Sequence, residues 1–190
     1  KRVDNPYLDP DKADQARVDN FDGAKKKAYE ANQKAVVLVK NHEKLLPGIY
    51  VSRKDEIGSD TVTTFDIRMK APNREPALHA GALHTIEHLA ATYLRNDEEW
   101  KDRIVYWGPM GCLTGNYLLM RGDLRSEDIV DLMRRTFMFV ADFDGDIPGA
   151  APKDCGNWLL HDLPMARWEA RKFVNEVLNV VKPENLNYPE

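Results

Sequence analysis

The sequence predicts an α+β fold in which helices pack on one face of an antiparallel sheet. Residues 61–69 alternate apolar and polar side chains with a period of two, which is typical of a half-buried strand. Residues 79–95 and 126–142 are predicted to form helices, with short strand-like segments between them. The chain contains no internal repeat. Strands interspersed with helices in this way favour an antiparallel sheet that helices cover on one face.

The first part of the chain is predicted to supply one helix and two strands. Residues 22–34 are rich in Ala and Lys, as is typical of a helix. Residues 35–39 form a β-branched apolar run, which indicates a buried strand. A turn at 46–48 then leads into a second strand at 49–51.

The strand at 61–69 has two different faces. Its apolar members, which we predict to point into the core, are Phe65, Ile67 and Met69. Asp66 and Arg68 alternate with them and are predicted to lie on the opposite face. Arg68 is therefore a candidate for binding a substrate carboxylate or hydroxyl, and a surface salt bridge is the alternative reading.

The middle of the chain is predicted to form a helix at 79–95 and two strands after it. The first of these strands is at 103–107, and a turn rich in Gly and Pro follows at 108–111. Cys112 comes directly after this turn, at the head of a strand over 113–120. A thiol in that position is predicted to be exposed at one end of the sheet.

The C-terminal part is predicted to contain two helices. Ser126 is the expected N-cap of a helix that runs to about residue 142, with acidic residues in its first turn. A loop at 144–153, rich in Gly, Pro and Asp, then leads to Cys155. The last helix is expected over residues 164–181.

Composition indicates a soluble globular protein with one substantial core. The chain has 190 residues, of which 43% are hydrophobic and 31% charged. Its formal net charge of -4 argues against nucleic acid as the main partner. There is no signal-peptide pattern, and no apolar run approaches the roughly 18 residues of a membrane-spanning helix. Two cysteines without an export signal favour reduced thiols in the cytoplasm.

The segment His84-Thr85-Ile86-Glu87-His88 carries the strongest chemical signal. Side chains four residues apart on a helix lie about 6 Å from each other, so both imidazoles can reach one metal ion. The carboxylate of Glu87 would lie beside that ion, where it could move protons. The alternative is a surface helix that carries two unrelated histidines.

A third metal ligand is needed, because a catalytic site of this kind has about three protein ligands and one open position. Cys155 is the best candidate, since it follows a Gly/Pro loop and precedes Gly156. The alternative is a small buried core cysteine. Cys112 is the second thiol of interest, because a nearby cation would let it exchange protons near neutral pH. Its alternatives are a core thiol or a disulfide with Cys155.

Taken together, these segments resemble S-ribosylhomocysteine lyase, the LuxS family, over about residues 42–179. The joint occurrence of three short motifs is highly specific. They are HTIEH at 84–88, GPMGC at 108–112 and KDCGN at 153–157. Further matching runs, in family order and spacing, are LLPGIYVSRKD at 45–55, TFDIRM at 64–69 and GDIPGA at 145–150.

The resemblance implies a role for each candidate residue. The implied metal ligands are His84, His88 and Cys155, and the implied metal is Fe(II), which Zn(II) or Co(II) can replace. Glu87 and Cys112 are the implied acid–base pair. His42 matches a family histidine that approaches the substrate, and we expect Arg68 to bind substrate as well.

The activity implied by the resemblance is cleavage of S-ribosylhomocysteine to homocysteine and 4,5-dihydroxy-2,3-pentanedione, the precursor of an interspecies signal. Two carbonyl shifts and a β-elimination accomplish it, without redox change or organic cofactor. The family works as a homodimer with active sites at the subunit interface. Its α+β fold is shared with some metallopeptidases.

The chain departs from the family pattern near two expected site residues. Leu113 stands where the family usually has Arg, and Asn116 stands where it has Phe. Near His42, Asn41 replaces an Asp, and Val37 stands where a substrate-contacting Ser is expected. These changes put the surroundings of Cys112 and the substrate contacts in question.

Residues 5–47 resemble a different family, the segment that follows the catalytic barrel in family-three β-glucosidases. The matching runs are NPYLDP at 5–10, AVVLVKN at 35–41 and LLP at 45–47. We therefore predict an N-terminal extension over 1–41, a LuxS-like catalytic domain over 42–190, and a chimeric or designed chain.

Two other functions compete with the lyase. An inverted-HxxEH zinc metallopeptidase would need a downstream Glu as third ligand, and Glu169 or Glu176 would have to serve. The KDCGN context of Cys155 argues against it. A non-enzymatic chain that keeps the metal site but has lost turnover is the other alternative.

Overall fold

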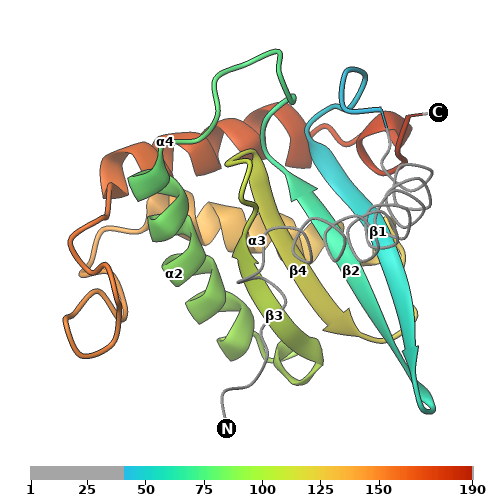
Figure 1. Cartoon of the computed structure of the whole chain (residues 1–190), viewed down its shortest axis with the longest axis horizontal. Coiled ribbons are helices and arrows are strands. Elements are labelled where there is room, and N and C mark those ends of the chain that lie inside the picture. Colours follow the sequence, from blue (N-terminus) through green and yellow to red (C-terminus); the bar gives the residue numbers. More distant parts are fainter. Residues whose placement is uncertain (1–40, 190) are drawn as a thin grey trace, which may run out of the picture. The chain divides into compact units, whose positions relative to one another are not determined.

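The computed structural model describes residues 41–189, which form a four-stranded antiparallel sheet and three α-helices. The strands are β1 (Gly48–Ile57), β2 (Asp60–Arg68), β3 (Ile104–Pro109) and β4 (Gly115–Arg121), in the spatial order β1-β2-β4-β3 (Figure 1). The α-helices are α2 (Ala80–Asn96), α3 (Val130–Asp142) and α4 (Leu163–Phe173). Short turns of other helix types are η2 (Lys101–Arg103), η3 (Ser126–Ile129), η4 (Val174–Leu178) and η5 (Pro183–Asn185).

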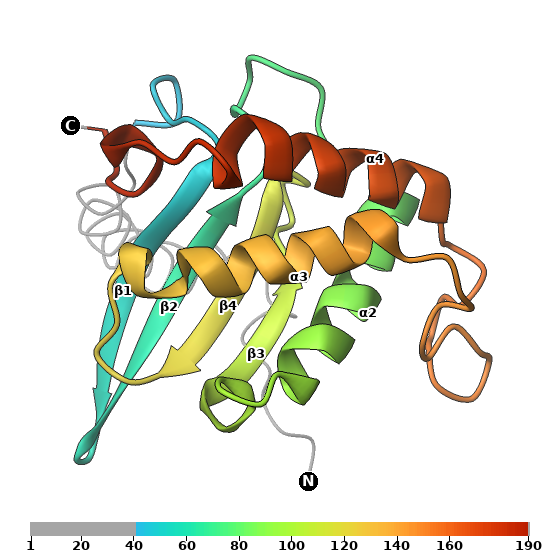
Figure 2. The ribbon, with the colours of Figure 1, turned by 180° about the vertical axis from the view of Figure 1, so that it is seen from behind.

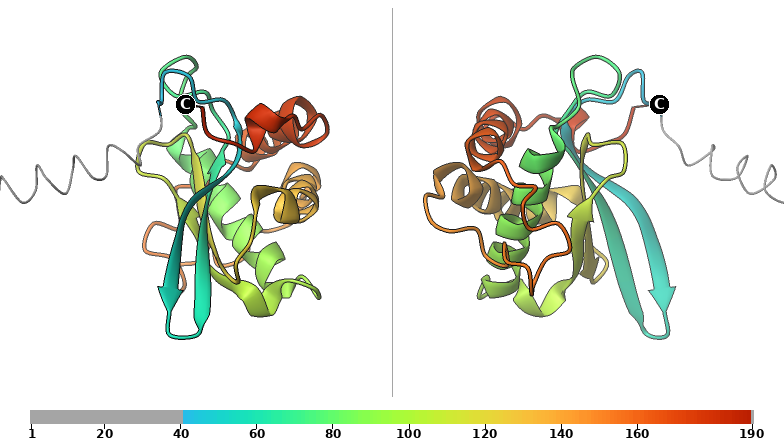
Figure 3. Two further views of the ribbon diagram at one scale, coloured as in Figure 1. Left: turned by 90° about the vertical axis from the view of Figure 1, so that its right-hand side faces the viewer. Right: turned by 60° about the vertical axis from the view of Figure 1, so that its left-hand side comes forward.

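The helices lie on one side of the sheet. In Figure 2, α3 and α4 cross in front of the strands, and the left view of Figure 3 shows the sheet from its edge with the helices on one side. This arrangement confirms the predicted α+β architecture. Within residues 41–189, no helix is long and apolar enough to cross a membrane.

The hydrophobic core lies between the sheet and the helices. Phe65 of β2, Ile86 of α2 and Phe137 of α3 are fully buried in it. Phe137 packs edge-to-face with Trp107 at a ring-centroid distance of 6.2 Å and with Phe173 at 4.9 Å. These aromatic contacts join β3, α3 and α4, and burial of their apolar surface is the main force that holds the layers together.

The fourth strand begins later than predicted. We expected it from residue 113, but β4 starts at Gly115, because Leu113 has a φ of 57° and the chain is still turning there. At Gly115 the backbone comes so close to β2 that a Cβ atom would lie 2.1 Å from the carbonyl oxygen of Ile67. Cys112 therefore lies within the turn and not at the head of the strand.

The predicted N-cap at Ser126 is wrong. The helix expected over 126–142 starts with the 3-10 turn η3, whose cap position is Arg125, and Ser126 is buried instead. The backbone N–H of Arg125 donates to a carboxylate oxygen of Asp128 at 2.8 Å. The carboxylate of Asp128, in the first turn, thus accepts a backbone N–H at this end of the helix. We had expected the hydroxyl of Ser126 to cap this end.

The last helix is shorter than expected. In place of one helix over 164–181, α4 ends at Phe173 and continues as the single π-helical turn η4 to Leu178. Its start is capped by Asp162, whose carboxylate accepts a hydrogen bond from the backbone N–H of Met165 at 3.0 Å.

Some expectations lie outside the described residues, namely the helix at 22–34 and the strand at 35–39. The strand expected at 49–51 forms part of the longer β1. Residues 41–189 belong to one compact unit by their internal contacts. The division into an extension over 1–41 and a catalytic domain over 42–190 stays a prediction.

Lys70, directly after β2, is buried against α4. Its Nζ lies 2.6 Å from Oε2 of Glu169, and these side chains are 6% and 8% exposed. We expect Glu169→Ala to lower the free energy of unfolding by about 3 kcal/mol, because Lys70 would remain buried and lose its nearest carboxylate. Glu75, at 3.6 Å, would compensate in part.

Urea unfolding at neutral pH measures this effect. The matched control is Asp60→Ala, which breaks the exposed pair between Asp60 and Arg121 at 3.1 Å and should cost less than about 1 kcal/mol. Equal losses in Glu169→Ala and Asp60→Ala would contradict the prediction.

Candidate metal centre and active site

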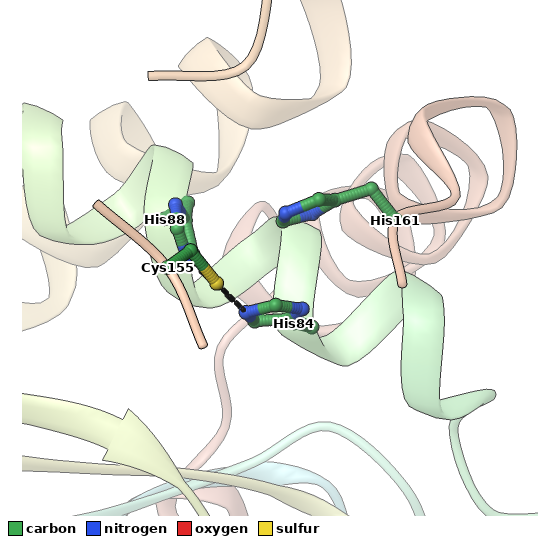
Figure 4. A group of neighbouring side chains, drawn as sticks. All are labelled: His84, His88, Cys155 and His161. Atoms are coloured by element: carbon green, nitrogen blue, oxygen red, sulfur yellow. Dashed lines mark hydrogen bonds between the residues drawn. The ribbon is translucent and has the colours of Figure 1, made fainter. Parts of the chain in front are cut away.

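Four potential metal ligands come together at one end of the helical layer. His84 and His88 are on α2, Cys155 is in the loop after α3, and His161 lies just before α4 (Figure 4). Their ligand atoms all lie within 4.8 Å of one another. The structure thus brings the three predicted metal ligands, His84, His88 and Cys155, to one point. It adds a histidine that we had not predicted, His161.

Hydrogen bonds orient both helix histidines toward this point. The Nδ1 atoms of His84 and His88 lie 2.7 Å from the carbonyl oxygens of Leu160 and Pro148, respectively. Because a carbonyl only accepts, each Nδ1 carries the proton and each Nε2 carries a lone pair. The two Nε2 atoms are 3.1 Å apart. Two lone pairs at this distance repel each other, and a cation between them removes the repulsion, so the donor set fits a metal ion.

Cys155 adds sulfur to the two nitrogens. Its Sγ lies 3.4 Å from Nε2 of His84 and accepts a hydrogen bond from the backbone N–H of Asn157. Both Cys112 and Cys155 are free thiols, so the alternative of a disulfide between them is wrong. Two imidazoles and one thiolate form a donor set that suits Zn(II), Fe(II) or Co(II).

His161 completes the cluster and was missed in the sequence analysis. Its ring stacks on that of His84 at a centroid distance of 4.2 Å and an interplanar angle of 16°. Burial lowers the pKa of His161, and any positive charge on His84 or His88 lowers it further, so its neutral form is favoured. The sequence feature that could have indicated His161 is its position six residues after Cys155, in the same loop.

Glu87 lines two cavities beside the candidate metal ligands. One cavity, of about 490 Å³, is also lined by His88, Tyr106 and Gly149. The other, of about 320 Å³, is lined by residues that include His84, Gly111, Leu113 and Asn157. The second cavity therefore extends from His84 to the turn that carries Cys112. A substrate in it would contact Glu87 and approach that turn.

Cys112 is exposed on its turn and sits beside a cation. Its Sγ lies 2.9 Å from Oγ1 of Thr114 and 3.7 Å from Nη1 of Arg68. Partial burial raises the pKa of the Cys112 thiol, but the hydrogen bonds from Thr114 and the charge of Arg68 outweigh it. The net result is a pKa below the ordinary value for cysteine, which enriches the thiolate near neutral pH.

Arg68 is buried, so the alternative of a surface salt bridge is wrong. It forms a two-pronged ion pair with Asp66, with Nε 3.0 Å from Oδ1, and both side chains are 4% exposed. The hydroxyl of Tyr188 also donates to Asp66 at 3.0 Å, and Tyr188 stacks on Tyr50 at 4.6 Å. The polar face of β2 is therefore covered by the C-terminal segment, and Arg68 reaches Cys112 from a fixed position.

Three other sequence candidates do not join the cluster. His42 lies in an exposed turn before β1 and lines neither cavity beside Glu87. Glu169 pairs with Lys70, and Glu176 lies near Lys172 on the exposed side of η4. A metallopeptidase would need Glu169 or Glu176 as its third metal ligand, but neither belongs to the described cluster. The cluster contains Cys155 instead.

Comparisons with known proteins show the family of this chain. The family model for LuxS, S-ribosylhomocysteinase, matches residues 38–184. The S-ribosylhomocysteine lyase of Phocaeicola vulgatus is 74% identical over 149 residues, which cover 78% of this chain and 92% of the relative. The S-ribosylhomocysteine lyase of Porphyromonas gingivalis strain W83 is 67% identical over 150 residues, or 79% and 94% of the two chains.

A more distant relative keeps the same coverage. The S-ribosylhomocysteine lyase of Clostridium acetobutylicum is 53% identical over 150 residues, or 79% of this chain and 94% of the relative. No comparison supports the resemblance of residues 5–47 to β-glucosidases, and it stays a prediction. The family match covers every residue of the metal cluster and of the two cavities. The chain belongs to the LuxS family of S-ribosylhomocysteinases.

Proposed function

We propose that the protein cleaves S-ribosylhomocysteine to homocysteine and 4,5-dihydroxy-2,3-pentanedione, the precursor of an interspecies signal. The observation that carries this proposal is the convergence of His84, His88 and Cys155 on one point, beside the carboxylate of Glu87. Its support is the membership of the chain in the LuxS family. The reaction moves a carbonyl group along the opened sugar and then expels the homocysteine thiolate, so it needs groups that move protons between neighbouring carbons.

The metal would be held by the two Nε2 atoms of His84 and His88 and by Sγ of Cys155. We propose Fe(II) as the resident ion, with Zn(II) or Co(II) as substitutes, following the family. A bound divalent ion supplies Lewis-acid polarisation of a substrate oxygen. The carbonyl oxygens of Leu160 and Pro148 keep both imidazoles in the tautomer that a ligand requires.

Cys112 would act as one proton-transfer group. Its thiol has a lowered pKa and is exposed, so it can take a proton from one substrate carbon and return it to the next. The positive charge of Arg68 favours the thiolate form of Cys112. We therefore propose that Arg68 belongs to the substrate site. Leu113, which replaces the usual family Arg, lines the cavity next to Glu87 with apolar surface.

Glu87 would be the second proton-transfer group. Its position between the two cavities lets its carboxylate serve a substrate bound against His84 or against His88. We assign it the protonation steps on the side opposite Cys112 and assistance to the departure of homocysteine. His42 remains our candidate for a further substrate contact.

The partner of this chain would be a second copy of itself. Strands β3 and β4 expose Val105, Tyr106 and Tyr117, which are 52%, 46% and 38% accessible. Large exposed apolar side chains on a sheet are suited to burial in a homodimer. The two free thiols fit a reducing cytoplasm, where we place the protein. We also propose that the fold is related to that of some metallopeptidases.

The test is release of homocysteine from S-ribosylhomocysteine by protein purified without oxygen and loaded with Fe(II), measured with a thiol reagent. We expect release, and we expect Glu87→Gln to slow it by a factor of about 10²–10⁴ with unchanged metal content. Glutamine keeps the size of the side chain and removes its acid–base function.

A matched substitution away from the site controls for the loss of a charge. Glu127 is exposed in η3, and Glu127→Gln should leave the rate unchanged. Absence of release from unaltered protein that holds one metal per chain would reject the lyase and leave a metal-binding scaffold.

A further inference from the structure

Hydrogen bonds decide which nitrogen of His161 carries its proton. The hydroxyl of Thr85 donates to the carbonyl of Gly81 at 2.8 Å and accepts from the backbone N–H of Asp162 at 3.0 Å. Its single proton is therefore in use, and Nδ1 of His161, at 3.2 Å from the same oxygen, must be the donor. The proton on Nδ1 leaves a lone pair on Nε2 of His161.

This lone pair has no partner within the described residues. Nε2 of His161 is buried and makes no hydrogen bond there. Figure 4 shows the ring pointing toward the space between His84, His88 and Cys155. Leaving a buried acceptor unpaired costs about 1–3 kcal/mol. Because Nε2 of His161 is such an acceptor beside the candidate metal ligands, we expect a bound molecule to donate a hydrogen bond to it.

The neighbouring residues hold His161 rigidly in this orientation. The carbonyl of Leu160 accepts from Nδ1 of His84 at 2.7 Å, and the carboxylate of Asp162 caps α4 through the N–H of Met165. The residues on both sides of His161 are thus anchored, one to the metal-binding helix α2 and one to α4. A side chain fixed from both sides is suited to a site that must be formed before the substrate arrives.

The stacking of His161 on His84 excludes it as a fourth ligand in this arrangement. A histidine binds metal through a lone pair in its ring plane, at about 2.0–2.1 Å. The two rings are nearly parallel, with an interplanar angle of 16° and centroids 4.2 Å apart. The in-plane lone pairs of His84 and His161 therefore lie in two separate, nearly parallel planes and do not point at one position. Nε2 of His161 faces the space beside the three residues that would hold the metal.

We infer that His161 is a further active-site residue, whose Nε2 accepts a hydrogen bond from a substrate hydroxyl held beside the metal ligands. This inference rests on the proposed lyase function, since the opened sugar of S-ribosylhomocysteine carries hydroxyls next to its carbonyl. Accepting such a bond fixes which hydroxyl and which carbon face Glu87. His161 thereby selects the polyhydroxy part of the substrate, and the metal is held by the other three residues.

The experiment compares three variants of the Co(II)-substituted protein. His161→Asn keeps an amide near the position of Nδ1 and removes Nε2, whereas His161→Phe keeps a stacked ring without nitrogens. His79→Asn is the matched control, because His79 is 63% exposed and lies outside the metal group. Metal content, the visible absorption of Co(II), its change on addition of S-ribosylhomocysteine, and thiol release are all measured.

We expect every variant to hold one Co(II) with an unchanged visible spectrum. In both His161 variants, the S-ribosylhomocysteine concentration at half-maximal spectral change should rise about tenfold, as expected for loss of one hydrogen bond. Their kcat/KM for thiol release should fall at least as much, and His79→Asn should behave like the unaltered protein. His161→Asn and His161→Phe disturb the surrounding structure differently but both lose Nε2. Equal effects in the two variants would therefore be due to the loss of Nε2 and not to altered folding.

Three results would overturn the inference. Loss of Co(II) or of its absorption in both His161 variants would make His161 a ligand. An unchanged spectral titration and unchanged kcat/KM would show that Nε2 touches no substrate. If the unaltered protein neither responds to S-ribosylhomocysteine nor releases thiol, the proposed lyase function itself fails, and the role of His161 fails with it.

Discussion

Cys155→Ala is expected to abolish metal binding and homocysteine release, whereas Cys112→Ala should keep one metal per chain and lose release alone. The reason is the position of each sulfur. Sγ of Cys155 lies 3.4 Å from Nε2 of His84, within the group of potential ligands. Sγ of Cys112 contacts Thr114 and Arg68 instead and belongs to no such group within the described residues.

The two substitutions control for each other, because each removes one thiol and leaves an alanine. Metal analysis after dialysis gives the content of each variant, and a thiol reagent follows turnover. Without the thiolate, only the two imidazoles of His84 and His88 remain as the proposed ligands, which is below the three that a catalytic site of this kind uses. If Cys112→Ala lost the metal and Cys155→Ala kept it, the roles of the two cysteines would be reversed.

Arg68→Met is expected to destabilise the protein and to shift the pH dependence of turnover. The free energy of unfolding should fall by about 3–5 kcal/mol, because Asp66 would remain buried without its ion-pair partner. The hydroxyl of Tyr188 still donates to Asp66, but one hydrogen bond from an uncharged donor does not replace a two-pronged ion pair. Urea unfolding at neutral pH measures the loss.

The same substitution should raise the pKa of Cys112. The positive charge of Arg68 favours the thiolate, so its removal favours the protonated thiol. Less thiolate is then present at neutral pH, and the rate falls there. The rate recovers as the pH rises, so the acid-side midpoint of the kcat/KM profile should move to higher pH.

A second substitution separates the two effects of Arg68. Arg121 is on β4 and forms an exposed pair with Asp60 of β2. Arg121→Met should change the free energy of unfolding by less than about 1 kcal/mol and should leave the midpoint of the kcat/KM profile unchanged. If Arg68→Met is destabilised but keeps the original midpoint of the kcat/KM profile, Arg68 has a structural role only. Thr114 would then be the residue that lowers the pKa of Cys112.

Local patterns were sufficient to predict the helix that carries the metal site. The helix predicted over 79–95 closely matches α2, and the placement of His84 and His88 on one face follows from helix geometry alone. The two faces of β2 were likewise predictable from its period of two, and Phe65 and Ile67 are in the core. The motif around Cys155 predicted it as the third ligand by resemblance to a family, and the structure places it within the group of potential ligands.

Other features depend on partners that are distant in sequence. Asp66 and Arg68 were expected on the face opposite the core, with a surface salt bridge as the alternative for Arg68. Instead, both side chains are buried, and Tyr188, 122 residues further along the chain, donates to Asp66. β4 starts late because the backbone is still turning at Leu113, and at Gly115 it lies closely against the carbonyl of Ile67. No local pattern contains either contact.

The sequence by itself thus determined the α+β class, the helix with its two histidines, and the family. Periodicity and short motifs are properties of neighbouring residues, so they can be read without a structure. Only the tertiary structure placed His161 beside His84 and fixed its tautomer through Thr85. It also set Arg68 against Cys112. These contacts join segments that are 44 to 77 residues apart, and packing of the helices and the sheet decides them.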